Sequence, residues 1–336
     1  MECHLLVPDL FWPAAAGDEP YRGLALPALE TLLGRGRRAR ISGTSLERWL
    51  AGRYRLADGL PLAPFSLRGD GGEPGADCWM RADPVHLKLH GDRLILADAS
   101  RLAVTPDEAR EFVAALNSHF AGDGISFVAA RPQRWYVRTG SDARLHTTPT
   151  SEAAGRSIEA LLPRGDDSAR WRRVINEAQM LLHQHPGNAA REQAGRPAVN
   201  SVWFWGAGRA RRPEAAYDTL WGEDPVAAGL AAASGGAARP LPASGASLLE
   251  PGRGSTHLAV LSLPATAYGE LADWREALAA LERSWAAVLL GGLWSAALES
   301  LTLHGLGPDY GYTSVLTRRD RLRLWRTRRP LRAYAA

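Results

Sequence analysis

The sequence predicts an α/β protein in which a compact α+β segment interrupts the part of the chain that forms the main sheet. Three observations carry this prediction. A short apolar run, Cys3–Val7, ends at Pro8-Asp9, as the buried strands of parallel sheets commonly end. A second apolar run, His257–Leu263, is followed by Leu271–Leu290, which has the length and spacing of an amphipathic helix. Between the two runs lies a region of alternating strands and capped helices.

The composition is that of a globular protein long enough for two packed cores, with 336 residues and 46% hydrophobic content. The net charge of +4 is weak evidence for a nucleic-acid partner, because acidic residues nearly balance basic ones. Only Cys3 and Cys78 are present, which excludes a disulfide framework and a cysteine zinc site. With no leader-like start and no long apolar run, we expect a soluble cytoplasmic protein and no membrane partner.

The first elements follow in chain order. The spacing of Ala25–Leu33 predicts a helix, and the Arg-rich stretch Arg35–Arg40 is interpreted as its solvated end. Gly, Pro and Asp are dense between residues 58 and 76, which predicts a loop. Apolar alternation on both sides of Gly91-Asp92 predicts a β-hairpin.

The next elements carry clear start signals. Thr105 and Glu108 have the spacing of a capping box, so a helix is expected from Pro106 onward. Further strands are predicted around Phe127 and Arg134–Val137. Ser168 is expected to cap another helix.

The most informative stretch, Leu181–Gly208, reads LLHQHPGNAAREQAGRPAVNSVWFWGAG. It resembles the signature of the archaeal-type cofactor-independent phosphoglycerate mutases of the alkaline phosphatase superfamily. In that signature a His-Pro-x-Asn, an Arg, a Gly-x-Pro and an Asn precede a Trp-x-Trp-Gly-x-Gly run. The resemblance extends over about residues 81 to 230.

This resemblance implies an alkaline-phosphatase-like sheet with helices on both faces. Residues 1–80 and 209–336 would form that core, and residues 81–208 would be an inserted α+β domain carrying the signature.

The resemblance also implies phosphoryl transfer through a Ser or Thr nucleophile, with two divalent metals held by Asp and His. Asp9 is the residual ligand candidate. After the strand His257–Leu263 the family has Asp-x-x-Gly-His, whereas this chain has Pro264–Tyr268, which contains neither a carboxylate nor an imidazole. The segment Pro149–Ser151 likewise stands where the family has Pro-His-Asp.

Most metal ligands are therefore predicted to be missing, and no cofactor is expected. The chain is interpreted as a non-catalytic binding or regulatory protein for a phosphorylated metabolite or a protein partner. The alternative is an active mutase or phosphotransferase with a rearranged Mn or Zn site, which Asp9, His257, His304 and Asp309 would serve if the fold gathers them. No nucleophile stands out, because the candidate hydroxyls are placed like capping groups: Ser42, Thr44, Ser45 and Ser66.

The polar residues of the signature stretch allow two roles. His185, Asn188, Arg191 and Asn200 are candidates to bind a ligand, since Arg and Asn offer directional donors to phosphate or carboxylate. Asn188, Arg191 and Asn200 are equally suited to holding the loop around Trp203 and Trp205 together by bonding to backbone carbonyls. Both roles stay open at this point.

The stretch Arg318–Arg326 interleaves Arg with Leu322, Leu324 and Trp325. Such a pattern can track a nucleic-acid backbone. The alternation of Leu with Arg favours a half-buried edge strand, and no wider basic stripe accompanies it in the sequence. Nucleic acid is therefore not the expected partner.

Overall fold

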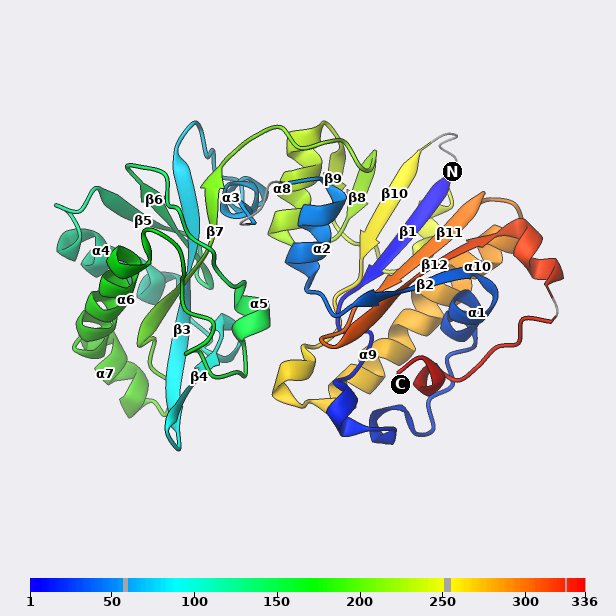
Figure 1. Cartoon of the computed structure of the whole chain (residues 1–336), viewed down its shortest axis with the longest axis horizontal. Coiled ribbons are helices and arrows are strands. Elements are labelled where there is room, and N and C mark those ends of the chain that lie inside the picture. The colour runs from blue at the N-terminus through cyan, green and yellow to red at the C-terminus, as the bar shows by residue number, and fades with distance from the viewer. Residues whose placement is uncertain (57–59, 251–254, 324, 336) are drawn as a thin grey trace. The chain divides into compact units, whose positions relative to one another are not determined.

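A computed structural model of the chain describes residues 1–56, 60–250, 255–323 and 325–335. The chain packs as two compact units (Figure 1). The first unit comprises Met1–Trp49, Ala215–Asp224 and Ser234–Ala336, and the second comprises Leu50–Glu214 and Pro225–Ala233. The predicted boundaries after residues 80 and 208 stay a prediction.

The first unit is built on a seven-stranded sheet in the order β2-β12-β11-β1-β10-β8-β9. The strands from β11 to β9 run parallel, whereas β12 runs antiparallel to both of its neighbours, β11 and β2. Their bounds are β1 Glu2–Val7, β2 Arg37–Ser42, β8 Thr219–Trp221, β9 Ala237–Arg239, β10 Thr256–Val260, β11 Ser300–Gly305 and β12 Tyr310–Thr317. The predicted α/β class is confirmed, because helices flank this mostly parallel sheet.

Three helices of the first unit pack on one face of the sheet: α1 (Pro27–Arg35), α9 (Leu271–Leu281) and α10 (Ala287–Trp294). A π-helical turn joins α9 to α10, so the predicted helix over Leu271–Leu290 is confirmed. Cys3, Leu5 and Val7 alternate along β1 and point into this core. Burial of that apolar face stabilises the unit and fixes the place where β1 ends. A further helix, α2 (Leu46–Arg53), follows β2.

The stretch Arg35–Arg40, interpreted as a solvated helix end, instead leads into strand β2, so that interpretation is wrong. Helix α1 ends at Arg35, and Arg37–Ser42 then pairs with β12. Gly36 makes the change of direction possible, because a Cβ there would collide with the hydroxyl of Ser314. Pairing with a distant strand satisfies this backbone, and no local sequence pattern reveals such pairing.

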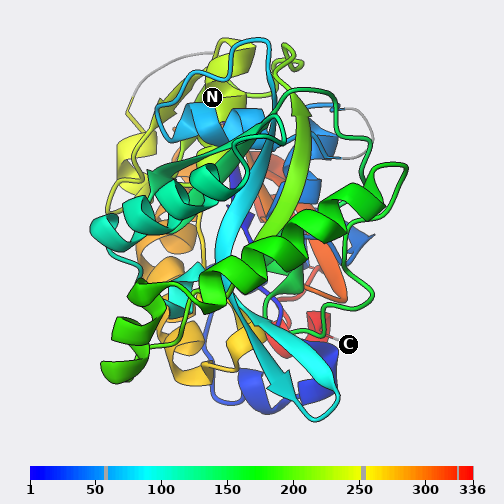
Figure 2. The same cartoon turned by 90° about the vertical axis from the view of Figure 1, so that its left-hand side faces the viewer.

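The second unit is an antiparallel sheet with helices, as predicted for an α+β segment. Its strands follow the order β4-β3-β6-β5, and β7 pairs with β3. Figure 2 shows α4 and α6 on the same face of this sheet. The bounds are β3 Cys78–His90, β4 Arg93–Ala97, β5 Ile125–Arg131, β6 Arg134–Thr139, β7 Ser201–Arg209, α3 Ala63–Gly69, α4 Pro106–His119, α5 Thr150–Ala153, α6 Ser168–His183, α7 Pro186–Gln193 and α8 Pro225–Ser234.

Local start signals were good guides in the second unit, with two exceptions. The capping box is present as predicted, since Thr105 Oγ1 accepts from the Glu108 amide and the Glu108 carboxylate accepts from the Thr105 amide. Ser168 does not cap α6, because Asp167 occupies the cap position and Ser168 is the first helical residue. The predicted loop between residues 58 and 76 contains α3, and its residues 58 and 59 lie outside the described parts of the chain.

The edge strand predicted for Arg318–Arg326 is wrong. Residues Arg318–Leu322 form a 3-10 helix, and Leu322 is 75% exposed rather than half-buried. The Asp320 carboxylate accepts from the amide and the hydroxyl of Thr317, which ends β12 and turns the chain. Leu324 lies outside the described residues.

Within the described ranges of the chain, each helix is too short or too polar to cross a bilayer.

Candidate functional site

Asp9 lies directly after β1, at the carboxyl end of the parallel sheet, where sites of α/β proteins form. Its φ of 55° is left-handed, a conformation that Asp adopts more readily than most residues. Oδ1 of Asp9 accepts a hydrogen bond from Thr266 Oγ1 at 2.9 Å, and its carbonyl oxygen accepts from Trp274 Nε1 at 2.7 Å. Burial raises the pKa of Asp9, and the bonds from Thr266 only partly oppose this. The strand end therefore presents a carboxylate partnered by a neutral hydroxyl.

Hydrocarbon packs beside this carboxylate. Leu10 and Phe11, the next residues in the chain, are fully buried. A Cβ at Gly305, the last residue of β11, would collide with Leu10, so the Leu10 side chain lies directly on that strand end. The other strand beside β1 is β10, and the segment that follows β10 carries Thr266. The groups that contact Asp9 and the residue after it are thus apolar side chains, an indole N–H and a hydroxyl.

His257 lies near the start of β10, at the opposite end of the sheet from Asp9. Trp221 Nε1 donates to His257 Nδ1 at 3.2 Å, and Nε2 lies 2.7 Å from Ser255 Oγ. Because an indole N–H can only donate, Nδ1 carries no proton and the neutral ring holds its proton on Nε2. Burial lowers the pKa of His257, which agrees with this neutral form.

His304 of β11 pairs with a second histidine that the sequence analysis missed. Its Nε2 lies 3.0 Å from Nδ1 of His4, and its Nδ1 lies 3.1 Å from Thr313 Oγ1. The two imidazole rings are nearly parallel, and the ring of Trp49 lies 4.8 Å from that of His304. The two histidines meet because of the strand register, which places Leu6 of β1 opposite His304. The sequence alone does not give that register.

Asp309 and the candidate nucleophiles have other partners. Asp309 is exposed, and its Oδ2 accepts from the Ala14 amide at 2.8 Å. Ser45 Oγ accepts from the amide of Arg48 at 3.3 Å, so capping is confirmed for Ser45. Ser66 does not cap, because it is buried within α3 of the second unit. Across the described parts of the chain, no group of three or more His, Cys, Asp and Glu side chains could hold a metal ion.

Asn188, in the second unit, closes the loop between α6 and β7. Its Nδ2 donates to the carbonyl oxygens of Leu182 at 2.7 Å and Val199 at 2.9 Å, and its Oδ1 accepts from the Val199 amide at 2.8 Å. The side chain is 2% exposed. These bonds use both donors of the amide and one acceptor position.

Arg191 is fully buried one helical turn further along. Its Nε donates to the Pro197 carbonyl at 2.8 Å, Nη1 pairs with the Glu108 carboxylate at 2.8 Å, and Nη2 donates to the Leu102 carbonyl. The guanidinium therefore holds α7, α4 and the chain before β7 together.

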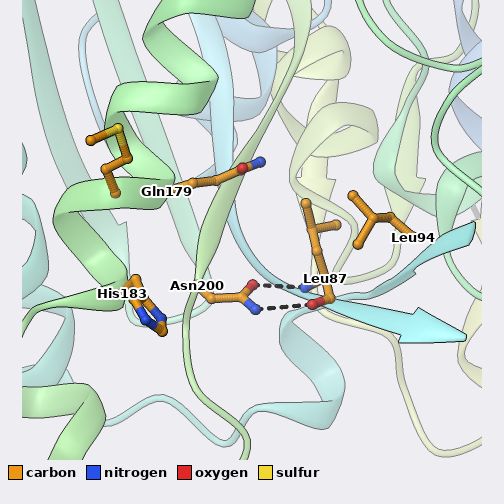
Figure 3. Close-up of a pocket in the computed structure, with 6 residues that line it drawn as sticks. Leu87, Leu94, Gln179, His183 and Asn200 are labelled. Carbon is orange, nitrogen blue, oxygen red and sulfur yellow. Dashed lines mark hydrogen bonds between the residues drawn. The ribbon is translucent and has the colours of Figure 1, made fainter. Parts of the chain in front are cut away.

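Asn200 and His185 also bond within the second unit. Asn200 bridges β7 to β3 through the Leu87 amide at 2.7 Å and the Leu87 carbonyl at 2.9 Å (Figure 3). His185 caps α7 by accepting from the Gly187 amide at 3.1 Å, and its ring contacts Phe112. Asn188, Arg191 and Asn200 thus each donate to backbone carbonyls, as the loop-holding role requires, and the ligand-binding role of all four candidates stays a prediction.

A shallow pocket of about 320 Å³ opens beside Asn200 (Figure 3). None of the side chains that line it is Arg or Lys, and most of the lining is apolar, so it offers little to a phosphate group. The pocket is lined by Leu87, Leu94, Gln179, Met180, His183 and Asn200.

The second unit also contains a buried charged cluster that the sequence does not reveal. Arg81 Nε donates to Asp83 Oδ1 at 2.9 Å, and Arg81 Nη1 donates to Ser66 Oγ at 2.7 Å. The other Asp83 oxygen accepts from Thr150 Oγ1 and from Trp205 Nε1, each at 2.7 Å. Matching parity in β3 places Arg81 and Asp83 on one face, but only the fold brings the remaining partners to them.

Comparison with known proteins agrees with the resemblance of the signature stretch. Residues 74–188 match the family model of the 2,3-bisphosphoglycerate-independent phosphoglycerate mutases. Over these residues the chain is similar to this family. A probable phosphoglycerate mutase of this type from Geobacter sulfurreducens is 29% identical over 153 residues, which is 45% of this chain and 38% of that protein. The enzyme of Methanosarcina mazei is 29% identical over 118 residues, 34% of this chain and 30% of its own.

The matches to curated phosphoglycerate mutases thus span less than two fifths of the length of those proteins. A solved protein structure from Pyrococcus horikoshii has the same fold along most of the chain. It superposes with a TM-score of 0.55 at 13% identity, covering 94% of this chain and 87% of that one.

The two metal ions that the phosphoglycerate mutase resemblance implies do not fit the side chains at these strand ends. A two-metal site needs carboxylates and imidazoles from several strand ends at once. Here Asp9 bonds to Thr266, while His257, His304 and Asp309 each bond to other residues. The fold does not gather the four residues that a rearranged site requires, so no reaction step can be derived through such metals.

Proposed function

We propose that this phosphoglycerate mutase-like chain is a binding protein that does not interconvert phosphoglycerates. The carrying observation is the hydrogen bond between Thr266 and Asp9. Because of this bond, a neutral hydroxyl occupies the place where the family resemblance implies metal-binding side chains. A phosphoryl group carries several negative charges. Without metal ions to neutralise them, the negative charge of the Asp9 carboxylate at the end of β1 would repel such a group.

A protein partner is the ligand class that the second unit favours. Leu89 and Met180 are 66% and 67% exposed, and both lie near the apolar pocket beside Asn200. Exposed apolar side chains beside a shallow apolar pocket suit a protein surface better than a phosphorylated metabolite. The pocket offers no Arg or Lys for a phosphate, so we place a phosphorylated metabolite second.

We also propose a cytoplasmic location. Cys3 and Cys78 are both buried free thiols, which is usual for proteins kept in a reducing compartment.

The test of the non-catalytic role measures metal content and mutase activity together. Purified protein is incubated with Mn²⁺, dialysed, analysed for bound metal and assayed with 3-phosphoglycerate. We expect substoichiometric metal and no conversion. Asp9→Asn is the matched variant, because it removes the carboxylate and suits the left-handed backbone at this position. Stoichiometric Mn²⁺ with turnover that Asp9→Asn abolishes would overturn the proposal.

The partner class is tested separately. Calorimetric titration with 3-phosphoglycerate should give no heat of binding. Met180→Asp should weaken binding to a protein captured by the wild type. Arg172→Asp is the control, because Arg172 is exposed on the same helix two turns earlier and does not line the pocket. Saturable binding of 3-phosphoglycerate, lost in Asn200→Ala, would favour the metabolite instead.

A further inference from the structure

Two segments far apart in the sequence form one basic surface in the first unit. Arg35–Arg40 covers the end of α1 and most of the edge strand β2. The described residues of Arg318–Arg332, which are 318–323 and 325–332, lie against it. Arg326 Nη1 donates to the Gly36 carbonyl at 2.8 Å, and a Cβ on Gly34 would lie 3.0 Å from the Thr327 carbonyl oxygen. Figure 1 shows the carboxy-terminal segment passing beside α1. We call these two segments together the basic edge.

The basic edge is far richer in Arg than the chain as a whole. Four of the six residues in Arg35–Arg40 and eight of the fifteen in Arg318–Arg332 are Arg, against 39 of 336 overall. Asp320 pairs with Arg323, and Glu30 pairs with Arg328. In the described structure, the remaining exposed Arg side chains of the edge have no acidic partner: Arg37, Arg38, Arg40, Arg318, Arg319, Arg321, Arg329 and Arg332.

Aromatic rings hold two of these guanidinium groups in place. Arg38 lies over the ring of Tyr334 at 4.9 Å, and Arg40 lies over Tyr310 at 5.0 Å. The two Arg residues alternate on one face of β2, about 6.6 Å apart along the strand. Nη1 of Arg38 donates to the Leu33 carbonyl at 2.9 Å, so its other N–H groups are the ones that would contact phosphate. A stacked guanidinium loses little side-chain entropy on binding.

An exposed aromatic side chain accompanies these charges. Trp325 is 77% exposed, next to Arg326 of the basic edge. An exposed indole among guanidinium groups is the arrangement by which proteins bind single strands, with bases stacking on rings and phosphates on Arg. A duplex hides its base faces, so it cannot use this ring in the same way.

We propose that the basic edge binds single-stranded nucleic acid, with its Arg side chains on the phosphates and Trp325 stacked on a base. From the sequence alone, nucleic acid is not the expected partner, because no wider basic stripe accompanies Arg318–Arg326. In the structure Arg35–Arg40 supplies that stripe, and the edge strand that competed with this interpretation is not formed. The inference does not depend on the proposed function, which concerns other surfaces.

The test measures binding of a fluorescent 20-nucleotide single strand to the full chain by anisotropy over a salt series. If about five phosphates are neutralised, affinity should fall about 100-fold between 50 and 200 mM NaCl. The triple variant Arg40→Gln, Arg319→Gln, Arg329→Gln should lower the salt slope by about 2. Trp325→Ala should weaken binding about tenfold and leave the slope unchanged.

The control removes the same charge elsewhere. Arg170→Gln, Arg172→Gln, Arg173→Gln on α6 of the second unit should leave affinity and slope unchanged. The proposal fails if the wild type does not bind at about 50 mM NaCl, or if the control loses as much affinity as the edge variant. It also fails if duplex DNA, polyglutamate or anionic lipid vesicles bind as tightly as the single strand, since that would show a general polyanion surface.

Discussion

The hydroxyl of Thr266 donates a 2.9 Å hydrogen bond to the carboxylate of Asp9, so the acidic side chain that ends β1 is partnered by a neutral group. The segment after β10, where the sequence differs from the family pattern, is therefore also the segment that supplies the partner of Asp9. Where the phosphoglycerate mutase resemblance implies Asp and His after this strand, the chain has a short 3-10 turn that begins at Thr266. That turn contacts Asp9 directly.

Thr266→Val should lower the free energy of unfolding by about 1–2 kcal/mol at pH 8 and by less at pH 5. The variant removes the donor to a buried carboxylate, which raises the pKa of Asp9 further above its ordinary value. A raised folded pKa means that the folded state binds the proton more tightly than the unfolded chain. The contribution of Asp9 to stability is thus present at low pH and is lost as pH rises through the folded pKa. Urea unfolding at the two pH values measures the difference.

Asp9→Asn is the control for this pH dependence, because it removes the titrating group. In that background Thr266→Val should cost the same at pH 5 and pH 8. An equal cost at both pH values in the wild-type background would show that the carboxylate is not the acceptor that matters.

Arg191→Met should lower the free energy of unfolding by about 3 kcal/mol, because it leaves buried carbonyls of Pro197 and Leu102 without donors. Arg196→Met is the matched variant, since Arg196 pairs with the same carboxylate of Glu108 but is 37% exposed. It should cost about 0.5 kcal/mol. If urea unfolding showed equal losses of unfolding free energy for the two variants, the burial of Arg191 would not make its contribution larger than that of Arg196.

Local patterns predicted the elements whose signals lie within a few residues, and failed where a distant partner decides. The Thr105 capping box sits within one turn and was found from sequence. Asp9 was placed at a strand end, because an apolar run stops there. Strand β2 was missed since only its pairing with β12 orders that Arg-rich backbone, and His4 was missed because its contact with His304 depends on strand register.

His257 should titrate below the ordinary histidine range in a proton NMR titration, because burial lowers its pKa and the Trp221 N–H occupies Nδ1. With a depressed folded pKa, the unfolded chain binds the proton more readily. His257 therefore reduces stability as pH falls from about 7 to about 5. His257→Gln should flatten that part of the curve of unfolding free energy against pH. A normal titration midpoint, or an unchanged curve in the variant, would contradict the neutral tautomer assigned here.

Asn188→Ala and Asn200→Ala separate the two roles that the signature stretch allows. Asn188 is buried and bonds to the backbone of Leu182 and Val199, so its loss should cost about 3 kcal/mol of unfolding free energy. Asn200 is only half-buried, and water can reach the Leu87 backbone that it bridges, so its loss should cost about 1 kcal/mol. Loop holding predicts that both losses appear in urea unfolding without any added ligand. If Asn200→Ala left stability unchanged and abolished binding of a phosphorylated compound, the ligand role would hold instead, since a side chain that only bridges two strands has no reason to affect binding alone.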